Sequence, residues 1–216
     1  MCVMNLTEIS KKLEQRLKLP LPGASAHEPM RATAIENLIP KFEHKLSPKP
    51  GGVLLLLYEE EGVIRFPLTK RQEYAGAHSG QVSLPGGKAE AGENTIQTAL
   101  RECEEEIGIE RDTPRVLGVL SDFFVIPSNF IITPVIAVCD TKPVFRPDPR
   151  EVAKIISGSL LELVGDDSIK RKEIRAAGQF RMMAPYFEIE GEMVWGATAM
   201  MINEFRHVLR EVLSQD

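Results

Sequence analysis

Cysteine, tryptophan and long apolar runs are all scarce in this sequence. Its 216 residues include three cysteines and one tryptophan. Cys2, Cys103 and Cys139 are too few and too widely spaced for a disulfide framework or a zinc site, so we expect a reducing, cytoplasmic compartment. The longest apolar runs, such as Val53–Tyr58, fall far short of the ~18 residues that a membrane-spanning helix needs. These absences predict a soluble protein with no membrane partner.

An excess of positive charge is also missing. The formal net charge is -5, and a general nucleic-acid binder needs a basic surface that displaces counterions from phosphates. We therefore expect no nucleic-acid partner. Met1–Pro20 lacks the continuous apolar centre of a secretory signal. With 43% hydrophobic and 26% charged residues, the composition is that of a globular chain and excludes a wholly disordered one.

The length suits one domain with an additional edge. We expect the compact domain at residues 51–216, preceded by an N-terminal helix and a connecting extension at residues 1–50. Within this extension, apolar residues spaced by four predict a helix over Thr7–Leu17. A second short helix is expected near Ala32–Leu38, between proline-rich connecting segments.

Extended and helical patterns alternate within the domain. The segments expected as strands are Val53–Tyr58, Val63–Leu68, Gln81–Leu84, Arg115–Val125, Ile131–Val138 and Phe180–Ile189. The segments expected as helices are Thr95–Ile107, Val152–Ile156, Leu160–Val164 and the chain from Trp195 onward. Strands on both sides of a central helix, with a closing helix, predict an α/β fold in which a mixed sheet lies between helices.

The helix expected over Thr95–Ile107 has an apolar side and an acidic side. The apolar side consists of Ile96, Leu100, Cys103 and Ile107, and Gly108 follows where a helix C-cap belongs. On this stripe Cys103 is expected to pack as a small hydrophobic residue, since no general base is paired with it. The other side of the helix is therefore the one that can carry chemistry.

Glu102, Glu105 and Glu106 project from that other side of the helix. A glutamate-rich run is often only a solvated face, but in a recessed site like charges ~6 Å apart cost roughly 3 kcal/mol, so such a cluster needs a cation. Oxygen ligands alone select Mg²⁺ or Mn²⁺. The preceding Gly86 and Gly87 allow close approach of a ligand, and the helix N-terminus suits a phosphate. This combination predicts metal-assisted hydrolysis of a phosphate ester or pyrophosphate.

The segment GKAEAGENTIQTALRECEEEIGI resembles the Nudix box. The matching positions are Gly87, Glu93, Arg101, Glu102, Glu105, Glu106, Gly108 and Ile109, whereas Cys103 stands where an aliphatic residue is usual. The resemblance implies an α/β/α sandwich that cleaves a nucleoside diphosphate linked to another group, with Mg²⁺ or Mn²⁺ as cofactor.

The resemblance also implies roles for individual residues of the box. Glu102 and Glu106 become the principal metal ligands, and Glu105 becomes a further ligand or the activator of water. The carbonyl of Gly86 is a backbone ligand, and Arg101 orients the acidic cluster for catalysis. Glu93 is implied to be structural.

A narrower resemblance lies upstream, where LTKRQEYAGAHSGQVSLPGG is similar to the additional motif of the coenzyme A pyrophosphatases. The matching positions are Leu68, Thr69, Arg71, His78, Gly80, Gln81, Pro85, Gly86 and Gly87, and the departures are Pro67, Gln72 and Leu84. The implied reaction converts coenzyme A or its derivatives into 4′-phosphopantetheine and adenosine 3′,5′-bisphosphate. The alternatives are a Nudix hydrolase of another derivative such as ADP-ribose, and a non-catalytic nucleotide sensor.

The same motif implies that Arg71, His78, Gln81 and Gly87 bind the substrate, a small nucleotide. Arg71 offsets phosphate charge in this interpretation, and its alternative is a surface ion pair. For His78 we rank holding the loop ahead of contacting phosphate.

Nudix enzymes commonly take a general base from a loop beyond the box, and Glu151 is our candidate. Its alternative is a helix-start residue that complements the helix dipole. Asp122 and Glu188 are weaker candidates. A homodimer is left open, although the sequence shows no self-complementary patch.

Overall fold

A large mixed sheet forms the centre of the computed structural model, which describes residues 5–36, 42–73, 80–176 and 180–214. Its strands are β2 (Lys49–Glu60), β3 (Val63–Arg71), β4 (Val82–Ser83), β5 (Gly86–Lys88), β6 (Arg115–Val119), β7 (Phe123–Val125), β8 (Phe130–Val138) and β9 (Val152–Ser159). The order is β4-β3-β2-β8-β6, with β5 beside β2, β7 beside β8 and β9 beside β3. The pair β2 and β8 is parallel and the other pairs are antiparallel, which confirms the predicted mixed sheet.

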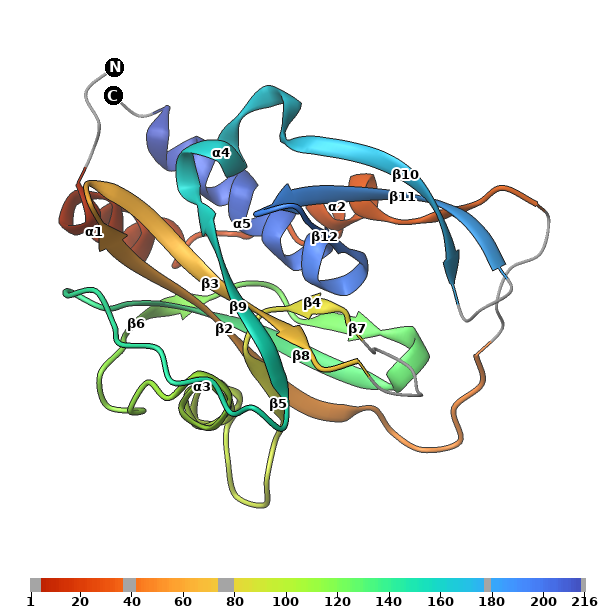
Figure 1. Cartoon of the computed structure of the whole chain (residues 1–216), viewed down its shortest axis with the longest axis horizontal. Helices are drawn as coiled ribbons and strands as arrows, with labels where there is room; N and C mark the ends of the chain where they lie inside the picture. The colour runs from red at the N-terminus through yellow and green to blue at the C-terminus, as the bar shows by residue number, and fades with distance from the viewer. Residues whose placement is uncertain (1–4, 37–41, 74–79, 177–179, 215–216) are drawn as a thin grey trace.

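A smaller antiparallel sheet stands beside the large one (Figure 1). Its strands are β1 (Thr33–Ala34), β10 (Ile169–Ala176), β11 (Phe180–Ile189) and β12 (Glu192–Trp195). The helices are α1 (Leu6–Arg16), α2 (Ala24–His27), α3 (Thr95–Ile107), α4 (Leu160–Val164) and α5 (Gly196–Leu213), with short 3₁₀ turns η1 (Glu28–Met30), η2 (Ile126–Ser128) and η3 (Asp166–Ser168).

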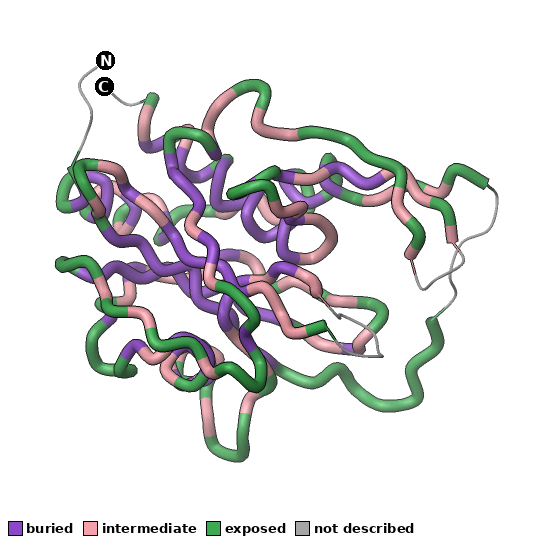
Figure 2. The backbone as a smooth tube through the Cα atoms, in the orientation of Figure 1, coloured by how far each residue is buried: buried purple, intermediate pink, exposed green. Residues whose placement is uncertain are grey.

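Helices cover both faces of the large sheet, as Figure 1 shows: α3 lies on one face, and α1 and α5 lie on the other. Alternate residues of β2 supply the two cores. Leu54 and Leu56 pack with α3, whereas Leu55 and Leu57 pack in the cluster that contains α1 and α5. A strand buried on both faces reads as a continuous apolar run, which explains the sequence of β2. The burial in Figure 2 follows this layering and confirms the α/β/α fold.

The predicted N-terminal helix is present as α1. It begins one residue earlier than expected, at Leu6, because Asn5 is the N-cap and forms a capping box with Glu8. The buried side of α1, which includes Leu13, packs in the same cluster as α5. The extension thus shares a core with the domain that follows it.

Two predicted helices are wrong. Val152–Ile156 belongs to β9, where its β-branched residues pair with β3. The sequence was ambiguous because residues four apart lie on one side of a strand as well as on one side of a helix. The segment near Ala32–Leu38 contains β1 instead of a helix, and positions 37 and 38 lie outside the described residues. The predicted strand over Arg115–Val125 is divided into β6 and β7.

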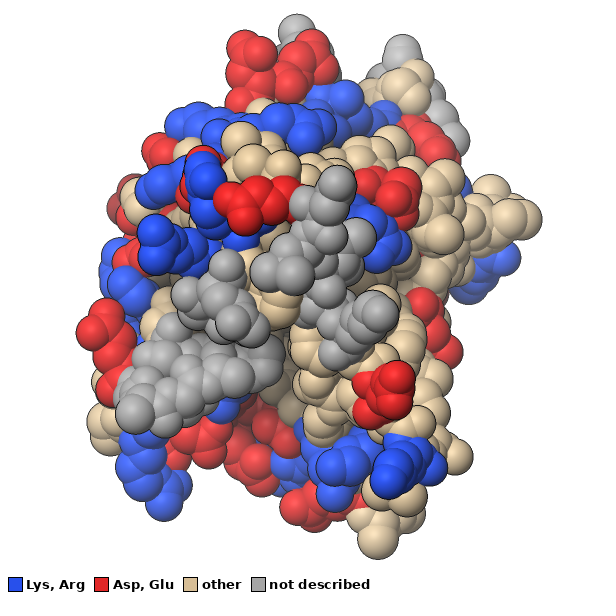
Figure 3. Space-filling model, turned by 90° about the vertical axis from the view of Figure 1, so that its right-hand side faces the viewer, with Lys and Arg blue, Asp and Glu red and all other residues tan. Residues whose placement is uncertain are grey.

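Within the described ranges, the structure contains no helix that is long and apolar enough to cross a membrane. On the face shown in Figure 3, groups of Lys and Arg side chains alternate with groups of Asp and Glu side chains.

Candidate active site

Helix α3 carries the acidic residues of the site, and local sequence fixes both of its ends. Asn94 and Gln97 form a capping box at the N-terminus, and Gly108, with φ of 73°, ends the helix in the left-handed conformation. These ends confirm the helix predicted over Thr95–Ile107. Gly52 of β2 lets the helix approach closely, since a Cβ atom there would lie 2.1 Å from the Thr95 carbonyl oxygen.

The two sides of α3 are not simply apolar and acidic. Cys103 is fully buried, and burial raises the pKa of its thiol, which agrees with the expected packing role. Glu106 is also buried, at 5% exposure, whereas the Glu105 side chain is 56% exposed. The Glu102 side chain, at 17% exposure, lies between them. The three carboxylates therefore occupy different environments, and Glu106 is not part of a solvated face.

Arg101 joins several groups around the Nudix-box segment. Its Nε donates to Glu93 Oε1 at 2.8 Å, and Nη1 lies 2.9 Å from Glu102 Oε1 and donates to Glu105 Oε2 at 2.8 Å. Nη2 donates to the Lys88 carbonyl of β5 at 3.0 Å. The hydrogen bonds from Arg101 lower the pKa of Glu93 to about 2, and those to Glu93 raise the pKa of Arg101. Arg101 thus links the helix to β5, consistent with an orienting role.

The end of β3 faces the buried Glu106. Thr69 and Arg71 are two residues apart on this strand, so their side chains leave the same side of it. Thr69 Oγ1 donates to Glu106 Oε2 at 3.3 Å, and the positive charge of Arg71 acts on the same carboxylate. Lys70, between them, pairs instead with Glu192 of β12 at 2.8 Å.

Glu102 and Glu106 both hold their protons more tightly than exposed glutamates do. Burial, reinforced by the charges of Glu102 and Glu151, raises the pKa of Glu106 to about 7, against the lowering effect of Arg71. Burial also raises the pKa of Glu102, to which Glu105 and Glu151 add. Arg101 opposes this rise at Glu102, as Arg71 does at Glu106, but burial prevails at both carboxyl groups. Such a site favours an additional cation.

Strand β5 supplies the opposite wall of the site. A Cβ atom on Gly87 would lie 2.6 Å from Oε1 of Glu102, so any larger residue here would displace the carboxylate from its present position. At Gly86, with φ of 153°, the backbone of Gly52 and Val53 occupies the space where a side chain would project. The glycine pair therefore brings the β5 backbone against Glu102, and the close approach of a ligand to these glycines stays a prediction.

The loop that precedes β9 is bonded to the C-terminal end of α3. The N–H groups of Arg146 and Asp148 donate to the carbonyls of Ile107 and Glu106 at 2.8 and 3.0 Å. These carbonyls are among those that an α-helix leaves without an internal partner. The loop also fits against Gly108, where a Cβ atom would lie 2.6 Å from Cβ of Arg146.

The same loop is bonded to the end of β3 and ends at Glu151. Gln72 donates from its backbone N–H to the Glu151 carbonyl at 3.1 Å and from Nε2 to the Pro149 carbonyl at 2.9 Å. Arg71 Nη2 lies 4.0 Å from Glu151 Oε2. A register shift places Ala153 as an extra residue opposite β3. Since β9 is a strand, Glu151 is not a helix-start residue.

The remaining predicted residues lie in different places. His78 falls outside the described residues. Gln81 accepts the backbone N–H of Arg71 with its carbonyl at 2.9 Å. Asp122 accepts from Thr133 Oγ1 at 2.6 Å, and its charge is not among those that shift the pKa of Glu102 or Glu106.

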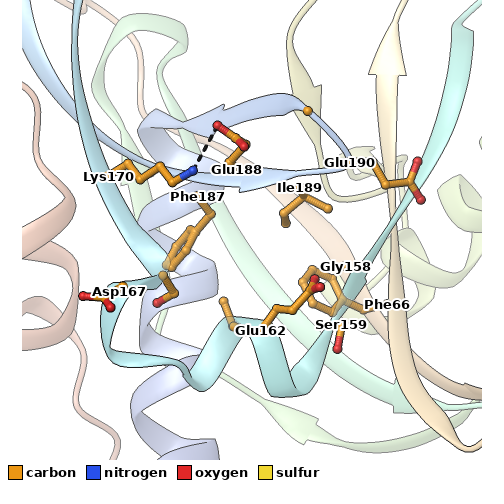
Figure 4. A pocket seen from close by; sticks show the side chains of 13 residues that line it. Phe66, Gly158, Ser159, Glu162, Asp167, Lys170, Phe187, Glu188, Ile189 and Glu190 are labelled. Carbon is orange, nitrogen blue, oxygen red and sulfur yellow. Dashed lines mark ion pairs between the residues drawn. The ribbon is translucent and has the colours of Figure 1, made fainter.

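Glu188 lines a separate cavity of about 300 Å³ (Figure 4). There it pairs with Lys170 at 3.2 Å, above Phe66 and Gly158. Gly158 lies near the end of β9, six residues beyond its first residue Val152, which corresponds to about 20 Å along an extended strand. Glu188 is therefore poorly placed as a base for the carboxylates of α3.

The N-terminus of α3 is likewise remote from these carboxylates. Asn94 Oδ1 accepts the N–H of Gln97 at 2.9 Å, which occupies one of the free donors. Glu106 comes eleven positions after Thr95, which corresponds to roughly 16 Å along the helix. The structure therefore does not place the expected phosphate cradle of the helix N-terminus beside Glu106.

The donor chemistry and charge of the site fit Mg²⁺ or Mn²⁺. Its side-chain donors are carboxylate oxygens, and its buried Glu106 favours a positive neighbour. As the side chains stand, no three His, Cys, Asp or Glu residues of the described ranges are arranged to hold an ion. Arg101 holds both Glu102 and Glu105, so an ion would have to draw Glu102 from this guanidinium.

Sequence reasoning assigned no role to Thr69 or Gln72. Thr69 was visible only as a motif match, although its spacing from Arg71 on a predicted strand was a usable signal. Gln72 was noted as a departure from the motif, and its bonds to the loop before Glu151 depend on tertiary structure.

Several known proteins are similar to this chain in sequence or in fold. The NUDIX domain family matches residues 48–177. Nudix hydrolase 15, mitochondrial, of Arabidopsis thaliana is 34% identical over 175 residues, covering 76% of this chain and 60% of that protein. The uncharacterized Nudix hydrolase NudL of Pectobacterium atrosepticum is 30% identical over 192 residues, covering 82% of this chain and 95% of that protein. The crystal structure of a Nudix hydrolase from M. smegmatis, RenU, has a TM-score of 0.52 at 17% identity, covering 78% of this chain and 88% of that one.

The plant relatives are longer proteins, since the matched segments span 60% and 54% of Nudix hydrolases 15 and 22 of Arabidopsis thaliana. The region that matches the family extends over 60% of this chain, 130 of 216 residues, and contains α3, the end of β3 and Glu151. On this match and on the bacterial relative covered at 95%, the chain belongs to the Nudix family.

Proposed function

We propose that this protein hydrolyses the pyrophosphate bond of a nucleoside diphosphate derivative. Coenzyme A or one of its derivatives is the first candidate, with 4′-phosphopantetheine and adenosine 3′,5′-bisphosphate as products. The observation that carries the proposal is the convergence of Glu102 and Glu106 of the Nudix box with Arg71 and Glu151, which lie outside it. Family membership supports the hydrolase class, and the Leu68–Gly87 motif supports the substrate.

The proposed cofactor is Mg²⁺ or Mn²⁺, which Glu102 and Glu106 would hold, with Glu105 and the Gly86 carbonyl as further ligands. When bound, such an ion supplies positive charge and lowers the pKa of a water ligand. Glu106 suits this role because its buried carboxylate favours a cation beside it.

The chain's own residues have distinct tasks in this proposal. Arg71 offsets the charge on the phosphate oxygens as the bridging bond breaks. Glu151, which lies 4.0 Å from Arg71, accepts the proton of the attacking water. Arg101 keeps Glu105 and Glu93 in place through its hydrogen bonds. Gln81 and Gly87 stay candidates for contact with the substrate.

A parallel assay tests the substrate. The purified protein is incubated with Mg²⁺ or Mn²⁺ and with coenzyme A, ADP-ribose or dATP, and products are identified by mass spectrometry. We expect coenzyme A to give 4′-phosphopantetheine at the highest kcat/KM. A preference for ADP-ribose or dATP would remove the coenzyme A assignment, and nucleotide binding without turnover would favour a sensor.

The cytoplasm stays the expected compartment of the protein.

A further inference from the structure

Thr69 is a buried residue of β3 whose hydroxyl group reaches the acidic site. The residue is 1% exposed, and its Oγ1 lies 3.3 Å from Oε2 of Glu106, which is itself 5% exposed. Strand β4 lies behind it, with Ser83 as its register partner. The Thr69 oxygen is 3.4 Å from both the carbonyl oxygen and Oγ of Ser83.

The single hydroxyl proton of Thr69 has three acceptors within reach, which are the Glu106 carboxylate and the carbonyl and hydroxyl oxygens of Ser83. A carboxylate is the strongest acceptor of the three, and the distance to Glu106 is the shortest. The hydroxyl of Ser83 can in turn donate to Thr69 Oγ1. The hydrogen bond therefore runs from the sheet to the helix and fixes one oxygen of Glu106.

We propose that Thr69 is a positioning residue that orients Glu106 for metal binding. The proposal rests on the proposed function in taking Glu106 as a metal ligand. Glu106 has its backbone on α3, and Thr69 has its backbone on β3, so their contact sets the orientation of the carboxylate relative to the sheet. With Oε2 held by Thr69, the other oxygen of Glu106 would be free to bind an ion.

The neighbours of Thr69 show why this role falls to it alone on the described part of β3. Lys70 leaves the opposite side of the strand and pairs with Glu192. Arg71 leaves the same side, but it is a cation that acts on Glu106 through its charge and lies 4.0 Å from Glu151. A neutral donor such as the Thr69 hydroxyl can hold an oxygen of Glu106 without adding a positive charge that would compete with an ion.

The test compares Thr69→Val, which keeps the shape and removes the donor, with Thr69→Ser, which keeps the donor. Thr133→Val is the matched control, since Thr133 is also a buried strand threonine that donates to a carboxylate, Asp122, at 2.6 Å. Each metal-stripped protein is titrated with MnCl₂ in a calorimeter, and its unfolding midpoint without metal is measured in parallel.

We expect Thr69→Val to bind Mn²⁺ about tenfold more weakly than the wild type, as loss of a hydrogen bond to a charged group allows. Thr69→Ser should restore the affinity to within about twofold, and Thr133→Val should leave it unchanged. Equal affinity of the wild type and Thr69→Val, failure of Thr69→Ser to restore it, or no Mn²⁺ binding by the wild type would overturn the inference. If Mn²⁺ binds as described but no nucleotide is cleaved, the proposed function fails and the positioning role stands.

Discussion

The backbone N–H of Asp148 donates to the carbonyl oxygen of Glu106 at 3.0 Å. The helix position that carries the buried carboxylate therefore also holds the loop that ends at Glu151. Because one backbone hydrogen bond connects them, the end of α3 limits the distance between Glu106 and this loop. The side chain of Gln72 supports the same loop from β3.

Replacing Gln72 by alanine removes its hydrogen bond to the Pro149 carbonyl and leaves its backbone bond to Glu151 in place. We expect kcat to fall about five- to tenfold, because small displacements of a catalytic group are costly. The Mn²⁺ affinity should not change. Gln15→Ala, at an exposed position of α1, is the control. An unchanged kcat would show that the loop does not depend on Gln72.

Replacing Arg101 by methionine leaves Glu93 and Glu102 partly buried without their cation. We expect the free energy of unfolding to fall by about 3 kcal/mol or more, as for other broken buried ion pairs. Urea denaturation measures this loss. Arg111→Met, which removes a solvent-screened pair with Glu104, should lower the free energy of unfolding far less. Similar losses for both variants would contradict the linking role of Arg101.

Gly87→Ala introduces a Cβ atom at 2.6 to 2.8 Å from the Glu102 carboxylate. The carboxylate has to move, so we expect Mn²⁺ affinity to fall about tenfold or more, which corresponds to ~1.4 kcal/mol. Gly165→Ala is the control, because its Cβ atom would lie 3.2 Å from the Glu162 carbonyl oxygen, and Gly165 has an ordinary negative φ. Undiminished Mn²⁺ binding by Gly87→Ala would show that Gly87 does not restrict the position that Glu102 takes when the metal is bound.

The stability of the metal-stripped protein should depend on pH through Glu106. Its pKa is about 7 in the folded protein and near 4.5 in the unfolded chain, so the folded state binds more protons between these values. This carboxyl group therefore lowers the free energy of unfolding as the pH rises from about 4.5 to about 7, by roughly 3 kcal/mol in all. Below pH 4.5 the effect is absent.

Glu106→Gln isolates this contribution, since glutamine keeps the size and removes the titration. We expect the metal-stripped variant to be more stable than the wild type at pH 8 and similar to it at pH 4.5. Urea denaturation across this range provides the comparison. A stability difference that does not vary with pH would contradict the burial of an ionisable carboxylate.

The central helix was predictable because its signals are local. The capping residue Asn94, the apolar stripe and Gly108 all lie within one short segment, and the structure confirms the helix over Thr95–Ile107. Arg101, Glu102, Glu105 and Glu106 share this segment, so their placement on one helix followed from spacing alone.

The rest of the site depends on contacts between distant segments. The i, i+4 spacing of Val152 and Ile156 suited both a helix and a strand, and only pairing with β3 decides for β9. The burial of Glu106 beneath β3 could not be predicted either. A helical pattern shows which residues lie on one face of the helix, but it does not show which part of the chain covers that face. The smaller sheet was predicted only in Phe180–Ile189, since β10 is exposed and rich in charged residues.

Anomalous diffraction from a crystal soaked in MnCl₂ tests the central claim most directly. The account predicts an anomalous peak within about 2.3 Å of carboxylate oxygens of both Glu102 and Glu106, with Glu102 drawn from Arg101. A fully soaked crystal with no peak at these two carboxylates, or with manganese bound only elsewhere, would contradict it.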